Sequence, residues 1–353
     1  MSILITDARP VAALSRDSRL PRWFPWALAV GVVVVLAVLF PLTPLAGRAG
    51  FVVAAGLLFL TGLAVASGLV EGRRRATDRV ASTLVTGAFL LALLPLGAVI
   101  VYGIKEGRQR FDLEFFNASL RSIGPRDAGG GAYHAILGTL EQVGLATLMS
   151  VPLGLLAAVY VVEYGRGRLA STIRFFVDVM TGIPSIVAGL FIFSFWILGL
   201  GQGFSGFAAS LALTVLMLPI VVRSAEEMLK LVPDGLREAS LALGVPRWRT
   251  ILSIVLPTAL PGIVTGVMLA VARVAGETAP VLLTAFGADS INRNPFSGAQ
   301  ASLPLMVFQE AGKPNSTAVN RAWTAALVLV LFVMVVNLLA RLVISRSKIG
   351  KKS

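Results

Sequence analysis

Apolar runs of about twenty residues recur along this chain, separated by short polar segments. A helix needs roughly twenty apolar residues to cross the hydrocarbon layer, where no water satisfies the backbone polar groups of an irregular segment. The 353 residues are 56% hydrophobic and 14% charged, whereas about a quarter of the residues in a soluble domain are charged. The sequence therefore predicts an all-α polytopic protein that crosses a lipid bilayer several times.

We expect about eight spans, with both termini in the cytoplasm. They lie near residues 26–45, 49–70, 80–104, 135–162, 175–200, 204–222, 263–285 and 322–344. Of the 31 Lys and Arg residues, 21 then fall in cytoplasmic segments, nine in outer loops, and Arg273 within a span. Positive charge concentrates on the cytoplasmic side of membrane proteins. This count places the loop 224–257 in the cytoplasm.

The expected organisation has four parts: a cytoplasmic tail at residues 1–25, an extra hairpin with a basic loop at 26–79, a six-span core at 80–346, and a basic tail at 347–353. The net charge is +13, but the basic residues form short clusters beside apolar runs, which argues against binding to nucleic acid. The absence of cysteine excludes thiolate chemistry, and a single histidine makes a histidine metal site improbable. We expect no metal and no cofactor in this chain.

The loop 224–257 is the longest polar, helix-competent segment between apolar runs. Asp234 is expected to cap a short helix through its carboxylate. Gly244 stands where that helix must turn in a left-handed conformation, and Pro246 suits the first position of the next helix. Small and apolar side chains then share one face of the first helix: Leu236, Ala239, Leu243 and, beside them, Ser240.

The spacing within this loop resembles the coupling-loop motif of permease subunits from ATP-binding cassette (ABC) importers. The matching residues are Glu238, Ala239, Ser240, Gly244, Ile254, Leu256 and Pro257. Ser240 departs from the pattern, since the family usually has alanine there. The resemblance implies a cytoplasmic helix–turn–helix that docks into a separate ATPase. The chain has no Walker-type G-x-x-x-x-G-K-[ST] sequence, so we expect a transport subunit that is not itself an enzyme. An ordinary amphipathic surface helix is the alternative.

Two charged residues, Arg273 and Glu277, lie near the middle of the expected span 263–285. A charged side chain at the centre of a spanning helix costs about 2.5–3.5 kcal/mol on insertion scales. Their spacing of four allows an ion pair on one helix face. An arginine in a water-lined pathway suits an oxyanion, because its planar fork matches phosphate oxygens. Glu277 would hold Arg273 while the path is empty. The alternative is a fixed ion pair that locks helices together.

The expected span 175–200 contains the sequence TGIPSIVAGLF. Pro184 removes a helical hydrogen-bond donor, and Gly182 and Gly189 permit close approach of another backbone. These residues indicate a helix break with a packing role. A simply kinked packing helix carries equal weight.

Three stretches together resemble the A-type permease of the phosphate-specific (Pst) ABC importer: RVAGETAP, TGIPSIVAGLF and RSAEEMLKLVPDGLREASLALG. The likeness covers about residues 80–346 and implies a type I ABC importer permease core of six helices, to which the hairpin is an addition. It implies a phosphate pathway that includes Arg223, Arg273 and Glu277. Arg223 has an equally weighted alternative as a topology anchor at the cytoplasmic end of its span.

The same resemblance implies an assembly in the cytoplasmic (inner) membrane. Its members would be a C-type permease, two copies of an ATPase that binds ATP–Mg, and an extracytoplasmic phosphate-binding protein that delivers inorganic phosphate. Three other functions stay open. The cargo would be sulfate or molybdate in the first, and the second is a self-sufficient secondary transporter or channel. In the third, the chain is a membrane subunit that signals phosphate status.

Overall fold

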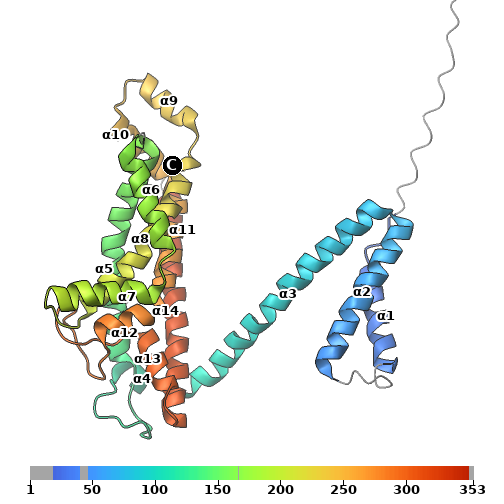
Figure 1. The fold of residues 1–353 in the computed structure, drawn as a ribbon, viewed down its shortest axis with the longest axis horizontal. Coiled ribbons are helices and arrows are strands. Elements are labelled where there is room, and N and C mark those ends of the chain that lie inside the picture. Colours follow the sequence, from blue (N-terminus) through green and yellow to red (C-terminus); the bar gives the residue numbers. More distant parts are fainter. Residues whose placement is uncertain (1–18, 40–46, 166, 350–353) are drawn as a thin grey trace, which may run out of the picture. The chain divides into compact units, whose positions relative to one another are not determined.

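The computed structural model describes residues 19–39, 47–165 and 167–349, and Figure 1 shows the fold. The chain divides into two compact units, Met1–Ile100 and Val101–Ser353. Within the described residues all elements are helical, apart from one isolated bridge between Phe286 and Gln300. The expected all-α fold is therefore confirmed.

The first unit contains α1 (Phe24–Leu39), α2 (Arg48–Val70) and most of α3 (Arg73–Gly107). Six helices of the described residues are long and apolar enough to cross a membrane, or seven if one bent pair counts as a span. The expected number was eight. The difference is α1, whose 16 residues extend only about 24 Å at 1.5 Å per residue. The last part of that expected span, residues 40–45, lies outside the described residues.

Glu71 fixes the turn between α2 and α3. Its carboxylate accepts hydrogen bonds from the backbone N–H of Leu20 at 2.8 Å, from Ser67 Oγ at 2.7 Å and from Arg79 Nη2 at 2.7 Å. Burial opposes ionisation of this carboxyl, but the three donors and the positive charge of Arg79 outweigh burial and lower the pKa of Glu71. Arg79, one of the basic residues counted on the cytoplasmic side, thus has a structural partner.

The second unit is a bundle of long helices with shorter helices at both ends (Figure 1). Its main elements are α5 (Tyr133–Val159), α6 (Arg168–Thr181), α8 (Gly206–Lys230), α11 (Leu256–Ala275) and α14 (Ser316–Ile349). α5 continues into the π-helical turn η3 (Tyr160–Tyr164), and α11 is preceded by η5 (Ile251–Val255). α14 continues to Ile349, so the start of the expected tail 347–353 is helical; residues 350–353 lie outside the described residues.

Two of the expected spans are broken. α6 and α7 (Ser185–Ile192), with the following π-helical η4 (Phe193–Gly199), bend by 108° at the break between them. α11 ends at Ala275 and α12 (Ala279–Ala285) follows after a short irregular segment. The expected continuous span 263–285 was therefore wrong, because the chain leaves the helix at Gly276. In Figure 1, α7 runs across the direction of α5 and α14.

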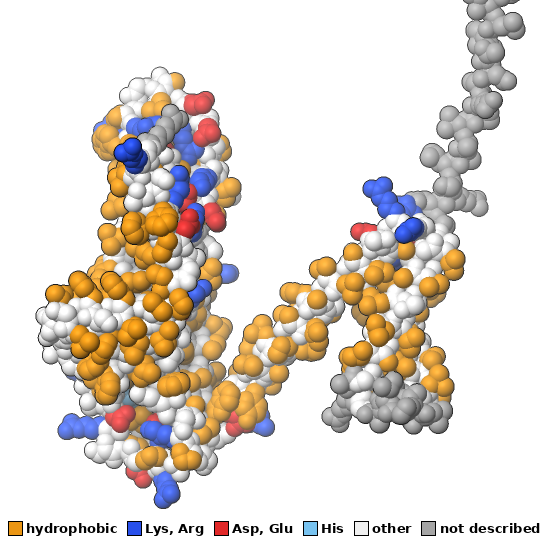
Figure 2. All heavy atoms as spheres, viewed as in Figure 1, with side chains coloured by type: hydrophobic (Ala, Val, Ile, Leu, Met, Phe, Trp, Pro, Cys, Tyr) orange, Lys and Arg blue, Asp and Glu red, His pale blue; other side chains and the backbone are white. Residues whose placement is uncertain are grey.

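The core of the second unit lies where α5, α7, α8, α11 and α12 meet. It is built from small and branched side chains, among them Ala146, Ala188, Leu213, Val271 and Val281. Large apolar side chains cover the middle of this unit's outer surface, and charged side chains gather toward its two ends (Figure 2). A surface of this kind suits surroundings of lipid.

The end of the second unit opposite α9 contains α4 (Leu113–Asn117) and α13 (Leu303–Ala311) (Figure 1). The segment 286–321, expected as a polar loop, thus contains a helix. A buried ion pair holds it, with Arg321 Nε 2.8 Å from Glu310 Oε2 and both side chains 1% exposed. Arg321 also donates to the Asp127 carbonyl oxygen at 2.8 Å. This pairing ties α13 and α14 to the segment before α5.

Candidate functional site

The polar loop forms two short helices at one end of the second unit, α9 (Asp234–Ala242) and α10 (Arg247–Thr250). Gly244 joins them with a φ of 77°, the predicted left-handed conformation. Two other expectations were off by one residue. Asp234 is the first residue of α9 and not its cap, so its carboxylate is free to bind Arg237 at 3.1 Å. Pro246 directly precedes α10, because the backbone turns helical only at Arg247.

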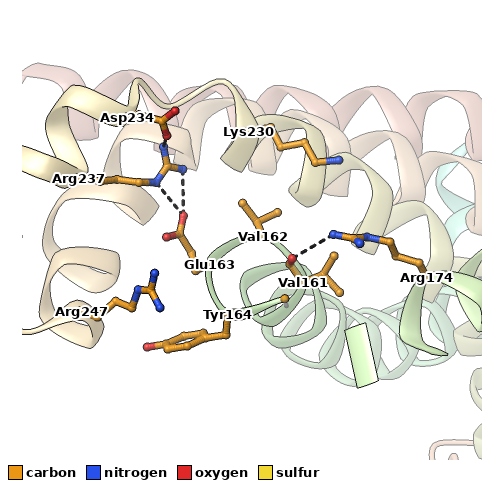
Figure 3. A pocket seen from close by; sticks show the side chains of 10 residues that line it. Val161, Val162, Glu163, Tyr164, Arg174, Lys230, Asp234, Arg237 and Arg247 are labelled. Atoms are coloured by element: carbon orange, nitrogen blue, oxygen red, sulfur yellow. Dashed lines mark hydrogen bonds and ion pairs between the residues drawn. The ribbon is translucent and has the colours of Figure 1, made fainter. Parts of the chain in front are cut away.

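Arg237 anchors α9 to the rest of the unit (Figure 3). Its Nε and Nη2 donate to Glu163 Oε1 at 3.1 and 2.9 Å, and Glu163 is 7% exposed on η3. The same guanidinium donates to the carbonyl oxygens of Leu229 and Val232, at 2.9 and 2.5 Å. These carbonyl groups belong to the end of α8 and the turn after it, where the last C=O groups of a helix have no N–H partner within the helix. Arg237 therefore connects α9 with both η3 and α8.

Ser240 fixes α9 to α10. Its hydroxyl lies 2.8 Å from Thr250 Oγ1, and both residues are buried. This contact separates Ser240 from the other residues that were predicted to share one face of α9. Ser240 points inward, while Leu236, Ala239 and Leu243 are exposed, Leu243 by 83%. The apolar side chains of α9 are therefore available to a partner.

The other residues of the coupling motif divide between this surface and the joint beneath it. Glu238 is exposed on α9. Ile254, Leu256 and Pro257 are half-buried where η5 passes into α11. Leu256 packs against a buried cluster that includes residues of α5, α6 and α8. The motif thus combines an exposed helix with the joint that holds it on the bundle.

A charged cluster surrounds Glu226, which is 2% exposed on α8. Three basic groups reach its carboxylate: Lys230 Nζ at 2.7 Å, Arg223 Nη1 at 3.4 Å and Arg174 Nε at 3.6 Å. Arg223 also pairs with Asp178 on α6. Arg223, predicted from the sequence as a pathway residue or an anchor, therefore ties α8 to α6.

The expected ion pair between Arg273 and Glu277 is absent from the contacts among the described residues. Arg273 lies in the last turn of α11, and Glu277 lies in the irregular segment before α12. A spacing of four brings side chains together only on a continuous helix, and this helix ends between them. Arg273 is exposed and Glu277 is half-buried in this chain.

The break between α6 and α7 lies at residues 182–184, as the sequence TGIPS indicates. Gly182 follows the last residue of α6, and Pro184 directly precedes α7. Gly189 lies on α7, and a Cβ at this position would be 2.6 Å from the Cα of Pro280 on α12. The segments that follow the two helix breaks therefore pack against each other, and a side chain at Gly189 would push them apart.

Sequence reasoning missed the partners that fix these residues. Glu163 is 74 residues from Arg237, and Asp178 is 45 residues from Arg223. The sequence did contain one signal for these partners. Acidic residues lie near the expected ends of apolar runs, and a partly buried carboxylate there is stabilised when a basic side chain pairs with it. No group of three or more His, Cys, Asp or Glu side chains within the described ranges is arranged to hold a metal ion.

The chain was compared with known proteins. Residues 150–349 match the family model described as "Binding-protein-dependent transport system inner membrane component". The "Phosphate transport system permease protein PstA 1" of Mycobacterium tuberculosis (strain CDC 1551 / Oshkosh) is 50% identical over 272 residues, which cover 77% of this chain and 90% of that protein. The PstA protein of Xylella fastidiosa (strain Temecula1 / ATCC 700964) is 40% identical over 81% of this chain and 99% of its own length.

Solved structures of ABC transporters were also found. A chain from an inward-facing MetNI methionine ABC transporter aligns with a TM-score of 0.47 and 24% identity, covering 61% of this chain and 94% of that one.

Proposed function

The chain belongs to the family of phosphate transport system permease proteins PstA, and on this premise we propose that it carries inorganic phosphate through the inner membrane as one subunit of an ATP-driven importer. As a permease it is a multi-pass inner membrane protein and a transport subunit without an ATPase site of its own. ATP hydrolysis takes place in a partner.

The observation that supports coupling to this partner is the construction of α9 and α10. Leu236 on α9 and Leu243 directly after it are exposed apolar side chains, and α9 is held by Arg237 and Ser240. A surface that is apolar and firmly anchored both binds a partner and transmits its movement. We assign docking of the ATPase to this element, with Glu238 and Ala239 on the exposed side and Gly244 at its turn.

The assembly that we propose contains a C-type permease, two copies of the ATPase and an extracytoplasmic phosphate-binding protein. ATP–Mg would be bound by the ATPase copies and not by this chain. Closure of the ATPase dimer would move α9. Because Arg237 binds Glu163 on η3, that movement would be passed directly to the end of α5.

We assign the phosphate pathway to Arg223, Arg273 and Glu277. Arg273 supports this role because it is exposed at the end of α11 and forms no ion pair with any described residue. A guanidinium whose donors are free can bind an oxyanion without first breaking an internal pair. Arg223 differs, since it is held by Asp178 and Glu226, and phosphate would have to compete with these carboxylates.

The test is uptake of radiolabelled phosphate by cells that express this chain with its transport partners, against a strain that lacks only this chain. We expect uptake that depends on the chain, resists excess sulfate and molybdate, and is lost in Arg273→Ala at normal membrane levels. Strong competition by sulfate or molybdate would change the cargo. Uptake that does not depend on the chain, with partners present, would favour the signalling function. Near-normal uptake by Arg273→Ala would refute the pathway role of this residue.

A further inference from the structure

An apolar groove of about 400 Å³ lies within the first unit, between the hairpin of α1 and α2 and the first part of α3. Side chains of all three helices line it, among them Trp26 and Ala29 on α1, Phe59 on α2, and Gly87 and Leu90 on α3. The groove exists because α3 turns away from the hairpin. Ala76 is buried near the start of α3, whereas every residue from 84 to 100 is exposed. The groove is therefore an open wedge with apolar walls.

Basic side chains gather at the end of the first unit where α2 passes into α3 (Figure 2). Arg73 and Arg74 are the first residues of α3, and both are exposed. Arg22, also exposed, lies close by, because the Glu71 carboxylate at the start of this turn accepts a hydrogen bond from the backbone N–H of Leu20 at 2.8 Å. Three arginines from two segments of the chain thus share one end of the unit.

The acidic groups at this end do not balance these arginines. The charge of Glu71 is matched by Arg79, whose Nε lies 2.6 Å from Glu71 Oε2. Within the described part of the first unit the other carboxylate is that of Asp78, which is exposed on α3. Arg73 and Arg74 form no ion pair with any described residue. This end of the unit therefore carries an excess of positive charge that attracts an anion.

The spacing between the arginines and the groove matches the layers of a bilayer. Ser82 and Leu90, which line the groove, lie about 12 and 24 Å beyond Arg74 along α3, at 1.5 Å per residue. One leaflet of the hydrocarbon core is about 15 Å thick. Trp23 and Trp26 are exposed near the start of α1, and tryptophan concentrates at the membrane–water interface. The arginines therefore lie at the level of lipid headgroups, and the groove lies at the level of acyl chains.

We propose that this groove binds an anionic phospholipid, with the headgroup at Arg73 and Arg74 and an acyl chain along Phe59 and Gly87. Such a lipid joins a negative phosphate to an apolar tail, and the first unit offers a partner for each at the corresponding depth. An apolar helix of another protein would fill the groove but leave the arginines without a counterion. The site lies in the hairpin added to the permease core and does not depend on the transported cargo.

A lipid in this groove joins the hairpin to α3. The hairpin itself is closely packed, since a Cβ at Gly62 on α2 would lie 3.2 Å from Leu28 Cδ1 on α1. α3 approaches α2 near the turn, where a Cβ at Gly68 would lie 3.9 Å from the Cβ of Ala76. An acyl chain adds apolar contacts farther along α3, where the protein leaves the helix exposed. Bound lipid therefore holds the hairpin against the first span of the core.

The experiment is native mass spectrometry of the purified full chain in detergent, titrated with phosphatidylglycerol or with phosphatidylcholine of the same acyl chains. We expect phosphatidylglycerol to bind at least about tenfold more tightly, the difference expected for one charge-assisted hydrogen bond. The double variant Arg73→Gln/Arg74→Gln should lose this preference. Arg121→Gln/Arg126→Gln is the matched control and should keep it, since it removes two exposed arginines from the loop before α5.

Gly87→Leu tests the groove with all arginines in place. No atom lies within 4 Å of a Cβ at Gly87, so the leucine side chain enters the groove without a clash and excludes the acyl chain. It should lower the affinity for phosphatidylglycerol by at least about tenfold, a loss of the same size as that of the headgroup contact. Gly97→Leu is its control, because Gly97 is also in open space on α3 and does not line the groove.

Three results would overturn the proposal. The first is equal affinity of the unsubstituted chain for the two lipids. The second is binding of phosphatidylglycerol by either test variant that equals binding by its control. The third is displacement of the lipid by inorganic phosphate, which would assign the arginines to a soluble anion without the groove. Loss of phosphate transport is not among these results, so the lipid site and the proposed function are tested separately.

Discussion

Arg237→Met should detach α9 from the bundle, because this side chain supplies the contacts that hold it. The substitution keeps an unbranched apolar side chain, shorter than that of arginine, and removes all five hydrogen bonds. It leaves the Glu163 carboxylate, which is 7% exposed, without its basic partner. Breaking a buried ion pair by removing one partner costs about 3–5 kcal/mol. Arg237 is 17% exposed, so we expect the lower end, about 3 kcal/mol.

The assay is thermal unfolding of the purified full chain together with a double-mutant cycle. A loss of about 3 kcal/mol should lower the unfolding midpoint by about 6–12 °C, at 2–4 °C per kcal/mol for a unit of this size. Glu163→Met should be destabilising in the same way. The double variant should be more stable than the sum of the single effects, by a coupling free energy of about 1–3 kcal/mol, because neither charge is then left unpaired.

Function provides a second measurement. In the assembled transporter, Arg237→Met should hydrolyse ATP while moving less cargo, because α9 no longer transmits its movement to η3. Arg249→Met is the control, since Arg249 is exposed and its guanidinium lies over the ring of the neighbouring Trp248. The reasoning is refuted if Arg237→Met lowers the midpoint no further than Arg249→Met, or if the two single effects simply add.

Gly244→Val should destabilise the α9–α10 turn by about 1–3 kcal/mol through backbone strain alone, because no atom lies within 4 Å of the added Cβ while φ is 77°. Gly235→Ala, also in open space but at an ordinary φ, is the control and should be neutral or stabilising. Ser240→Ala should cost about 1 kcal/mol through loss of the Thr250 hydrogen bond. Because the folded pKa of Glu71 lies below the ordinary glutamate value of 4.5, its contribution to stability is present above pH 4.5 and is lost as pH falls through the folded pKa.

Each of these is checked by unfolding of the full chain. A Gly244→Val protein as stable as Gly235→Ala would show that the turn tolerates a side chain. An unchanged midpoint in Ser240→Ala would mean that the hydroxyl pair contributes nothing. For Glu71, the comparison is Glu71→Gln between pH 3 and 7. If the two proteins lose stability in parallel on acidification, the acid sensitivity lies elsewhere.

The short-range features of the site were predictable from the sequence. Gly244 and Pro246 specify a turn between two helices because each restricts its own backbone, and the structure has that turn. Pro184 marks a break for the same reason. Arg237 lies inside the same predicted segment, yet its role was missed, because its partner Glu163 is 74 residues away. A charge pattern along the chain does not tell which helices will be neighbours.

Arg273 and Glu277 illustrate the opposite case, in which a local rule failed. Their spacing predicts a contact only if the helix continues, and nothing in the spacing requires this. The structure ends α11 at Ala275 and packs α12 against α7, where Gly189 admits Pro280. The energy of that packing comes from a segment about ninety residues earlier in the chain. Helical periodicity in the sequence does not predict a helix end that is set by such tertiary contacts.

Hydrophobicity and chain order alone determined that this protein crosses a membrane as helices, since a lipid environment leaves few other ways to satisfy a backbone. They also determined which loop would be polar and helical, and where it would turn. The tertiary structure decided that α11 ends at Ala275 and which charged side chains find partners. Glu226 became the centre of three basic groups, and Arg237 gained Glu163 of η3 as its partner. These outcomes depend on distances between segments far apart in sequence, which only packing sets.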